Sequence, residues 1–341
     1  MRLRLEDPEA LRALGQHRDP QLLAHLAPQS VHIGLPGLAL AAREVEHVVA
    51  GRARAQHLPG SDVEPGHPVD ESHADHCARL RGMPFAEING QRVHYQDSGG
   101  EGLALVFSHG ILMDHEMFAA QQELAREYRV ITWDARGHGL TESDRRPFTY
   151  WDQARDVLGL LDHLEIEQAA LVGAAEGGQA SVRAALLAPD RIVALALIST
   201  LLGEESPRAQ EFYGQMFGRW LAEGPIDELT TVFAALTIND PEENARWIAK
   251  WRERDRELVA EPATCLLERE DFSERLRQIR CPAVVMYGTA DPLFGAQEAE
   301  ELSEALRYCV GVVPVEGGSH ATPLTCPDQV NAALSYFLGE I

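Results

Sequence analysis

Short apolar runs that alternate with amphipathic helical segments dominate the chain from residue 83 onward. The apolar runs lie at 103–109, 128–134, 169–174, 192–199, 282–288 and 310–316. Each run is continuous, which is typical of parallel strands buried on both faces. Segments of helical periodicity separate them, as at 115–127, 150–164 and 177–188. This alternation predicts an α/β fold with a mostly parallel sheet and helices on both faces.

Two regions depart from this alternation. Residues 85–97 contain two alternating runs around Asn89 and Gly90, a pair typical of the type I′ turn of a β-hairpin. Residues 202–278 show only helical patterns, for example at 208–223 and 241–259. We therefore expect a helical cap, inserted before the strand at 282–288, within a core made of residues 83–201 and 279–341.

Residues 1–82 predict a helical N-terminal extension that ends in a linker. Apolar residues at 36–58 approach helical spacing, whereas 59–75 is rich in proline, glycine and acids. We expect this extension to pack on the core, to mediate a homodimer or to serve as an interaction module. His73, His76 and Cys77 lack the second, separated pair of ligands that structural zinc sites use, so no metal is expected.

Charge and composition limit the binding partners and the cellular location that we expect for the protein. The formal net charge of −23 argues against nucleic acid or an anionic membrane as the partner, because both require a basic surface. No apolar run reaches the roughly 18 residues of a membrane span, and no signal peptide is expected. The five cysteines are scattered and lack CxxC spacing. We therefore expect a cytoplasmic protein without a disulfide framework.

The main chemical signal lies in a strand, sharp turn and helix at 169–188. Gly173 and Gly177 stand two residues before and two residues after Ala175, at the turn. In a G-x-S-x-G elbow these positions are small because side chains there would collide with the neighbouring strand and helix. The central position, where a nucleophile is expected, holds Ala175.

This stretch resembles the nucleophile elbow of the α/β-hydrolase fold superfamily, in its serine hydrolase type with a helical cap. Four other segments stand in the family's order. Residues 108–111 resemble its oxyanion loop, 134–139 its D-x-R-G-x-G turn, 288–292 the strand end with the triad acid, and 317–320 the loop with the triad histidine. Each motif alone is weak, but five in the correct order over residues 83–341 form a specific signal.

The resemblance implies roles for four residues. His320 would act as general base and then general acid, while Asp291 would hold its imidazole in the required tautomer. The backbone N–H groups of Ile111 and Glu176 would form the oxyanion hole. We expect the Glu176 carboxylate itself to face solvent or a neighbour. The resemblance implies no cofactor.

An aromatic stripe in the predicted cap supplies candidate substrate contacts. It comprises Phe212, Tyr213, Met216, Phe217 and Trp220. From it we assign Phe212, Phe217 and Trp220 to the substrate pocket, together with His115, which follows the oxyanion loop. A largely apolar cap favours an apolar ester or lactone as the small-molecule substrate.

Four polar residues near the motifs are interpreted as structural. Asp134, Arg136 and His138 belong to a turn whose charged side chains tie the loop together, and His109 braces the oxyanion loop.

Ala175 leaves two interpretations open, because a methyl group cannot attack a carbonyl. In the first, alanine replaces the serine of an ester or lactone hydrolase and inactivates it. In the second, the chain naturally lacks a nucleophile and acts as a small-molecule binder, lyase or cyclase. We favour the first because the oxyanion loop, Asp291 and His320 are all retained. Loss of an aspartate nucleophile, as in epoxide and haloalkane hydrolases, would leave the same sequence.

Overall fold

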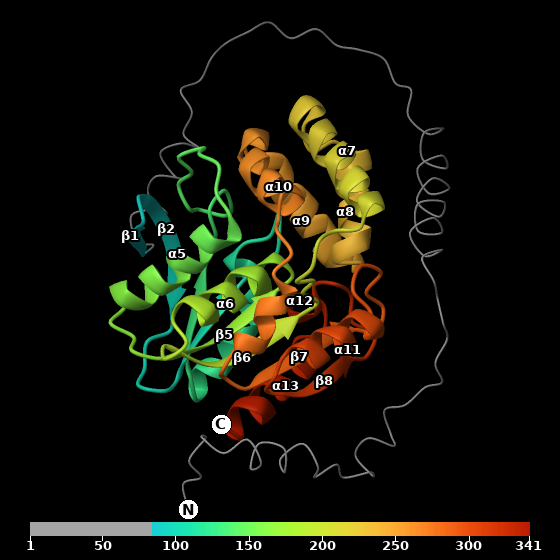
Figure 1. The fold of residues 1–341 in the computed structure, drawn as a ribbon. Helices are drawn as coiled ribbons and strands as arrows, with labels where there is room; N and C mark the ends of the chain where they lie inside the picture. The colour runs from blue at the N-terminus through green and yellow to red at the C-terminus, as the bar shows by residue number, and fades with distance from the viewer. Residues whose placement is uncertain (1–83) are drawn as a thin grey trace, which may run out of the picture.

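The computed structural model describes residues 84–341, so the expected extension of residues 1–82 lies outside the described part of the chain. An eight-stranded sheet runs through the centre of the molecule (Figure 1). Its strands are β1 (Phe85–Ile88), β2 (Gln91–Asp97), β3 (Ala104–Ser108), β4 (Arg129–Trp133), β5 (Ala169–Ala174), β6 (Ile192–Ile198), β7 (Ala283–Gly288) and β8 (Cys309–Val315).

The strands lie in the order β1-β2-β4-β3-β5-β6-β7-β8. β2 pairs antiparallel with β1 and with β4, and all other neighbours pair parallel. The β1–β2 turn holds Asn89 and Gly90 at φ values of 49° and 78°, as a type I′ turn requires. The prediction of a mostly parallel α/β sheet is therefore confirmed.

Helices cover both faces of the sheet because successive strand residues point to opposite sides. Leu105 and Phe107 of β3 belong to one apolar cluster, and Val106 between them belongs to the other. The first face carries η1 (His115–Arg126), α12 (Thr322–Thr325) and α13 (Pro327–Gly339). The second carries α5 (Tyr150–His163), α6 (Glu176–Leu187) and α11 (Ala296–Ala305).

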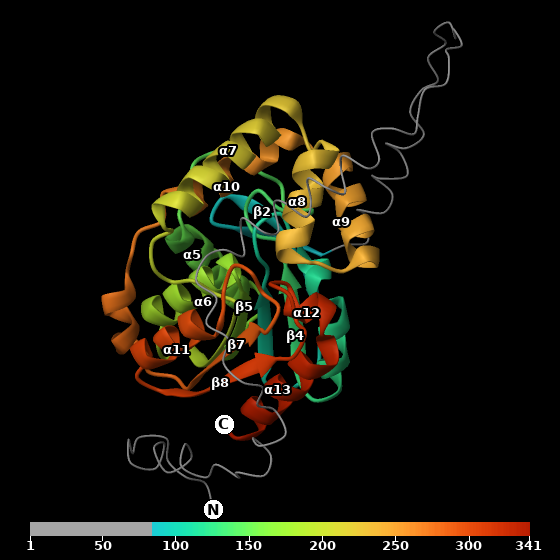
Figure 2. The ribbon, with the colours of Figure 1, turned by 90° about the vertical axis from the view of Figure 1, so that its right-hand side faces the viewer.

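The chain between β6 and β7 is helical, and we call it the helical insertion. It comprises α7 (Pro207–Glu223), α8 (Asp227–Thr237), α9 (Pro241–Glu253), η2 (Arg256–Val259), α10 (Ala260–Leu267) and η3 (Ser273–Gln278). Figures 1 and 2 show α7 to α10 gathered together beyond one end of the sheet. Among the described helices, none has both the length and the apolar character that a membrane crossing needs.

The prediction of helix over 241–259 is wrong in one respect. The structure divides this segment into α9 and η2, with a break between them. Arg254 has extended backbone angles, with φ −85° and ψ 145°. The Asp255 side chain then accepts a hydrogen bond from the Glu257 N–H and caps η2. An N-cap aspartate competes with helix continuation, and apolar periodicity alone does not reveal it.

Candidate active site

The turn from β5 into α6 keeps the backbone of a nucleophile elbow. Ala175 has φ 49° and ψ −117°, in the left-handed region that favours glycine. A Cβ atom on Gly177 would lie 1.9 Å from the Ser108 carbonyl oxygen, and one on Gly173 would lie 2.4 Å from the Gly178 Cα. Backbone atoms approach this closely only where side chains are absent. The elbow is therefore intact, with a methyl group at its tip.

The predicted histidine and acid are brought together at the ends of β7 and β8. The Nδ1–H of His320 donates to Asp291 Oδ2 over 2.8 Å. The other carboxylate oxygen accepts from the backbone N–H groups of Leu293 and Phe294. The Asp291 side chain is fully buried. This arrangement fixes the imidazole tautomer, with Nδ1 protonated and Nε2 left to accept a proton.

Three carboxylates act on the protonation of His320. Burial alone lowers the pKa of His320, but the charge and hydrogen bond of Asp291 oppose this effect. The charges of Glu176 and Glu205 act in the same direction as Asp291, so the pKa is raised above its ordinary value of 6.5. The imidazole therefore stays protonated to a higher pH than a free histidine.

One of the two predicted oxyanion amides is already occupied. The N–H of Ile111 donates to Glu176 Oε2 over 2.9 Å. The N–H of Glu176 lies in the first turn of α6, where helical amides have no acceptor within the helix. The carboxylate of Glu176 thus faces a neighbour, and that neighbour is the oxyanion loop itself. The chain places a negative charge where a developing oxyanion would bind.

Glu205, Arg269 and Tyr213 also lie near this centre, and their placement did not follow from the sequence. Glu205 pairs with Arg269 over 2.8 Å, with both side chains largely buried. Burial raises the pKa of Glu205, and the Glu176 charge adds to that effect. Burial and the charges of Glu205 and Glu176 also raise the pKa of Tyr213, on α7. Tyr213 belongs to the predicted aromatic stripe, but was not among the residues assigned to the pocket.

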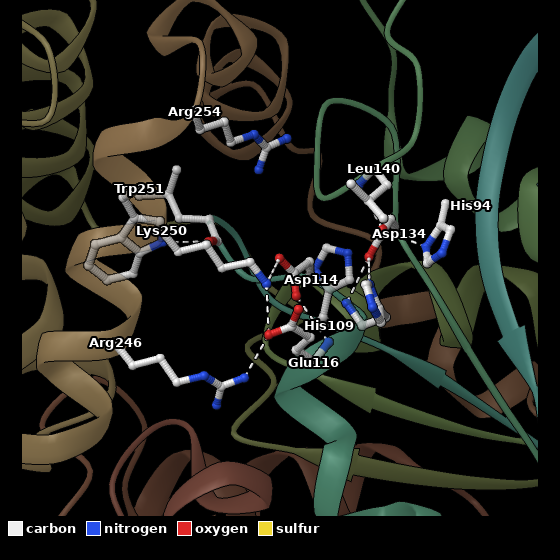
Figure 3. A network of polar contacts seen from close by, with 12 residues as sticks. His94, His109, Asp114, Glu116, Asp134, Leu140, Arg246, Lys250, Trp251 and Arg254 are labelled. Carbon is white, nitrogen blue, oxygen red and sulfur yellow. Dashed lines mark hydrogen bonds and ion pairs between the residues drawn. The ribbon is translucent and has the colours of Figure 1, made fainter. Parts of the chain in front are cut away.

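The helical insertion is fastened to the loop that follows β3 (Figure 3). Trp251 Nε1–H of α9 donates to the carbonyl of Leu112 over 2.7 Å. Leu112 has φ 60°, an uncommon value for a residue other than glycine. Beside it, Lys250 pairs with Asp114 over 2.6 Å, and both Lys250 and Arg246 contact Glu116. The backbone that presents the Ile111 amide is therefore held from the side of the insertion.

Asp134 organises the base of this loop. Its carboxylate accepts hydrogen bonds from Nδ1 of His94, from Nδ1 and N–H of His115, and from the N–H of Leu140 (Figure 3). Burial alone would raise the pKa of Asp134, but the bonds from His115 and His94 hold it well below its ordinary value. The ring of His115, which we assigned from the sequence to the substrate pocket, is buried against Asp134 in the structure.

His94, His115 and Asp134 also have the spacing of potential metal ligands. In this geometry each histidine Nδ1 lies within hydrogen-bonding distance of one Asp134 oxygen, at 2.9 and 2.8 Å. Nδ1 atoms that donate protons to a carboxylate offer no lone pair to a cation. Hydrogen bonding accounts for this cluster without a metal.

Arg136 and His109, which we also interpreted as structural, each connect two segments of the chain. Arg136 forms a salt bridge with Asp156 of α5, so it fastens the turn to a helix rather than to Asp134. His109 Nδ1 donates to the Gly110 carbonyl over 2.8 Å, and its Nε2 accepts the N–H of Ala135. His109 therefore links the oxyanion loop to the turn after β4.

The three aromatic residues assigned to the pocket have different environments. Phe217 is 2% exposed and packs within the apolar cluster of the first sheet face, against which Phe212 packs half-buried. Trp220 lines a small cavity together with Leu112 and Trp251. Trp220 therefore borders a cavity next to the oxyanion loop.

Comparisons with known proteins agree with this geometry. A family model described as alpha/beta hydrolase fold matches residues 104–322. The putative carbamate hydrolase RutD of Azorhizobium caulinodans is 30% identical over 272 residues, which cover 76% of this chain and 99% of that protein. A thermophilic esterase from Thermogutta terrifontis superposes with a TM-score of 0.69 at 26% identity, over 76% of this chain and 98% of that one. The enol-lactonase from Burkholderia xenovorans gives 0.68 at 28%, over 75% and 100%. The chain belongs to the α/β-hydrolase fold family.

Proposed function

We propose that this chain represents a hydrolase of carboxylic esters or lactones of the Ser-His-Asp type, impaired because alanine stands at the nucleophile position. The observation that carries the proposal is the elbow backbone at Ala175, with its strained φ of 49°, retained together with the His320–Asp291 pair. A strained backbone conformation persists only where the surrounding structure enforces it, and such strain concentrates at functional sites. The relatives named as esterase, enol-lactonase and carbamate hydrolase support a hydrolytic reaction.

The mechanism requires serine at position 175. The Oγ–H of that serine gives its proton to His320 Nε2 while Oγ attacks the carbonyl carbon of the substrate. The negative charge on the carbonyl oxygen is bound by the amides of Ile111 and Glu176. Collapse of the intermediate expels the alcohol, which takes the proton from His320 and leaves an acyl-enzyme. Water, deprotonated by His320, then attacks the acyl group and releases the acid.

The experiment compares the chain with its Ala175→Ser variant on p-nitrophenyl butyrate. We expect the serine form to release p-nitrophenolate with turnover, and the alanine form to show none above the uncatalysed rate. The double variant Ala175→Ser, His320→Ala is the matched control, and it should lose the activity gained. A folded serine form without activity on several aryl esters and lactones would refute the proposal.

A second candidate function is favoured by the Glu176 carboxylate at the Ile111 amide. A carboxylate in that position repels an oxyanion, as expected for a protein that binds a small molecule, or acts as a lyase or cyclase, without a covalent step. For this function, Ala175→Ser leaves ligand binding or turnover unchanged, whereas changing His320 reduces it. Comparing the two variants with one ligand distinguishes the candidates.

A further inference from the structure

The backbone that presents the Ile111 amide is a strained turn. The N–H of Met113 donates to the carbonyl of Gly110 over 3.2 Å, so residues 110–113 form a β-turn with Ile111 and Leu112 at its centre. Leu112 has φ 60° there, a conformation that glycine adopts much more readily. A strained residue keeps such a conformation only where the surrounding structure enforces it. The contacts around this turn therefore decide where the Ile111 amide points.

Lys250 of α9 is the only lysine among the 341 residues, and its ammonium group lies in an ionic cluster beside this turn. Its Nζ atom is buried and lies 2.6 Å from Asp114 Oδ2 and 3.1 Å from Glu116 Oε2. The centre of the Trp247 ring lies 4.8 Å from Nζ and adds a cation–π attraction. Figure 3 shows the side chain directed from α9 toward the two carboxylates. An ammonium group withdrawn from water depends on such partners for its stability.

Asp114 connects this cluster to the backbone of the turn. It follows Met113 directly, is 4% exposed and is the N-cap of η1. Its Oδ1 accepts the N–H of Glu116 over 3.0 Å, while its Oδ2 faces Lys250. A buried carboxylate that is bound through both oxygens has little freedom to move. The end of the turn is therefore fixed relative to η1 and to α9 at the same time.

Two more side chains of α9 contact the same segment. Arg246 lies 2.6 Å from Glu116, and the indole N–H of Trp251 donates to the carbonyl of Leu112. Burial alone raises the pKa of Glu116, but Lys250 and Arg246 hold it below its ordinary value, so the carboxylate stays charged. One helix of the insertion thus holds the strained residue itself and the two acidic residues that follow it.

We propose that Lys250 is a positioning residue for the oxyanion hole, and that the Ile111 amide keeps its binding geometry only while α9 is docked on the loop. The inference rests on the proposed hydrolase function and concerns the regulation of the same site. Displacement of α9 separates the ammonium from Asp114 and Glu116 and removes the contacts that enforce the Leu112 conformation. The position of the helical insertion therefore determines whether the oxyanion hole is complete. An exposed ion pair would contribute little to such a coupling, but here the Nζ atom and Asp114 are both buried.

The first measurement uses the full chain with Ala175 in place and needs no turnover. Hydrogen exchange of the Ile111 amide is followed by NMR after labelling with 15N-isoleucine, and Ile131, buried in β4, reports on global unfolding. We expect Lys250→Met to accelerate exchange at Ile111 about tenfold or more, with little change at Ile131. Unchanged exchange at Ile111 would overturn the proposal. Equal acceleration at both amides would also overturn it, because it would show a general loss of stability.

Two further variants test whether the charge at this position is responsible. Lys250→Arg keeps the charge and should leave the exchange rate within about threefold of the parent. Arg252→Met removes another cation of α9, whose partner Asp227 lies on α8, and should have no effect at Ile111. Exchange as fast in Lys250→Arg as in Lys250→Met would show that the ammonium charge does not fix the loop, and would overturn the assignment.

A double variant covers the case in which Lys250→Met folds poorly. Asp114→Asn combined with Lys250→Met removes both charges of the buried pair and retains a good N-cap residue for η1. This form should fold, yet exchange at Ile111 should stay about tenfold faster than in the parent. A return to the parent rate would mean that the pair does not position the amide.

The second measurement is kinetic and uses the Ala175→Ser background. Lys250→Met should lower kcat about tenfold or more with KM nearly unchanged, because an oxyanion donor acts in the transition state. A higher KM with unchanged kcat would place Lys250 in substrate binding and overturn the inference. An inactive Ala175→Ser parent would refute the proposed hydrolysis, whereas the exchange measurement decides the positioning role by itself.

Discussion

The carboxylate of Glu176 accepts a 2.9 Å hydrogen bond from the backbone N–H of Ile111. In the proposed mechanism this amide also binds the oxyanion, so the oxyanion and the Glu176 carboxylate compete for one donor. In the Ala175→Ser background we therefore predict that Glu176→Leu raises kcat. The gain should reach up to about 10²- to 10³-fold, the amount one oxyanion donor contributes. Steady-state kinetics on p-nitrophenyl butyrate measures the change.

Glu176→Gln is the matched control for that prediction. It keeps the shape and the hydrogen-bond acceptor but removes the charge, so its kcat should fall between those of the Glu176 and Leu forms. Equal kcat in all three forms would mean that the carboxylate leaves the amide without cost when substrate binds.

The raised pKa of His320 predicts the pH dependence of the restored enzyme. A general base works in its neutral form, so kcat/KM of the Ala175→Ser variant should rise with pH through an apparent pKa above 6.5. Because Glu176 contributes to this upward shift, Glu176→Gln should move the rise to lower pH. A rise centred at or below 6.5 in the parent serine form would contradict the prediction.

The same group links stability to pH without any need for activity. Since the folded pKa of His320 lies above 6.5, its contribution to the free energy of unfolding is fully present below that pH. The contribution is lost as pH rises through the folded pKa. NMR titration of the His320 ring in the alanine chain should give that pKa directly, and Asp291→Asn should lower it.

The indole N–H of Trp251 donates a hydrogen bond to the carbonyl of Leu112, the residue that follows the oxyanion loop. Leu112 is 6% exposed. Trp251→Phe leaves that carbonyl without its donor, so we predict a loss of about 1–3 kcal/mol in the free energy of unfolding beyond the packing loss. Trp247→Phe, one turn earlier on α9, is the matched control. Its indole N–H has no partner in the described part of the chain, so Trp247→Phe breaks no hydrogen bond.

Urea denaturation of both variants separates the two contributions. In the Ala175→Ser background, Trp251→Phe should also lower kcat more than Trp247→Phe, because the Ile111 amide precedes Leu112 directly. Equal effects of the two variants on both readouts would show that packing, rather than the hydrogen bond, is what α9 supplies.

The sheet was predictable because strands that are buried on both faces appear in the sequence as continuous apolar runs. The run at 103–109 became β3 (Ala104–Ser108), and the run at 169–174 became β5 (Ala169–Ala174). Asp291 and His320 were found through motifs at the ends of strands, where parallel topology brings residues distant in sequence together. Their 2.8 Å contact follows from that topology.

Side-chain direction and the contacts of the insertion were not predictable. The Glu205–Arg269 pair joins residues on either side of the five helices from α7 to α10, η2 included, and its position depends on how those helices pack. The direction of the Glu176 carboxylate depends on a loop amide 65 residues away. The hydrogen bond between the His115 ring and Asp134, 19 residues later, was unpredictable for a similar reason. The periodicity of apolar residues indicates which positions are buried. It does not indicate which groups a polar side chain contacts.

The elbow glycines give the most direct test of the fold around position 175. A Cβ atom on Gly177 would lie 1.9 Å from the Ser108 carbonyl oxygen, a backbone atom of β3 that cannot move without disturbing the sheet. Gly177→Ala should therefore lower the free energy of unfolding by about 3 kcal/mol or more, as overpacking against a rigid partner does. Gly214→Ala, in α7, is the control because nothing lies within 4 Å of its Cβ position. That change should stabilise the protein by about 0.5–1 kcal/mol through helix propensity. If urea denaturation gave both variants the same stability, β3 and α6 would not be in the close contact that the elbow requires.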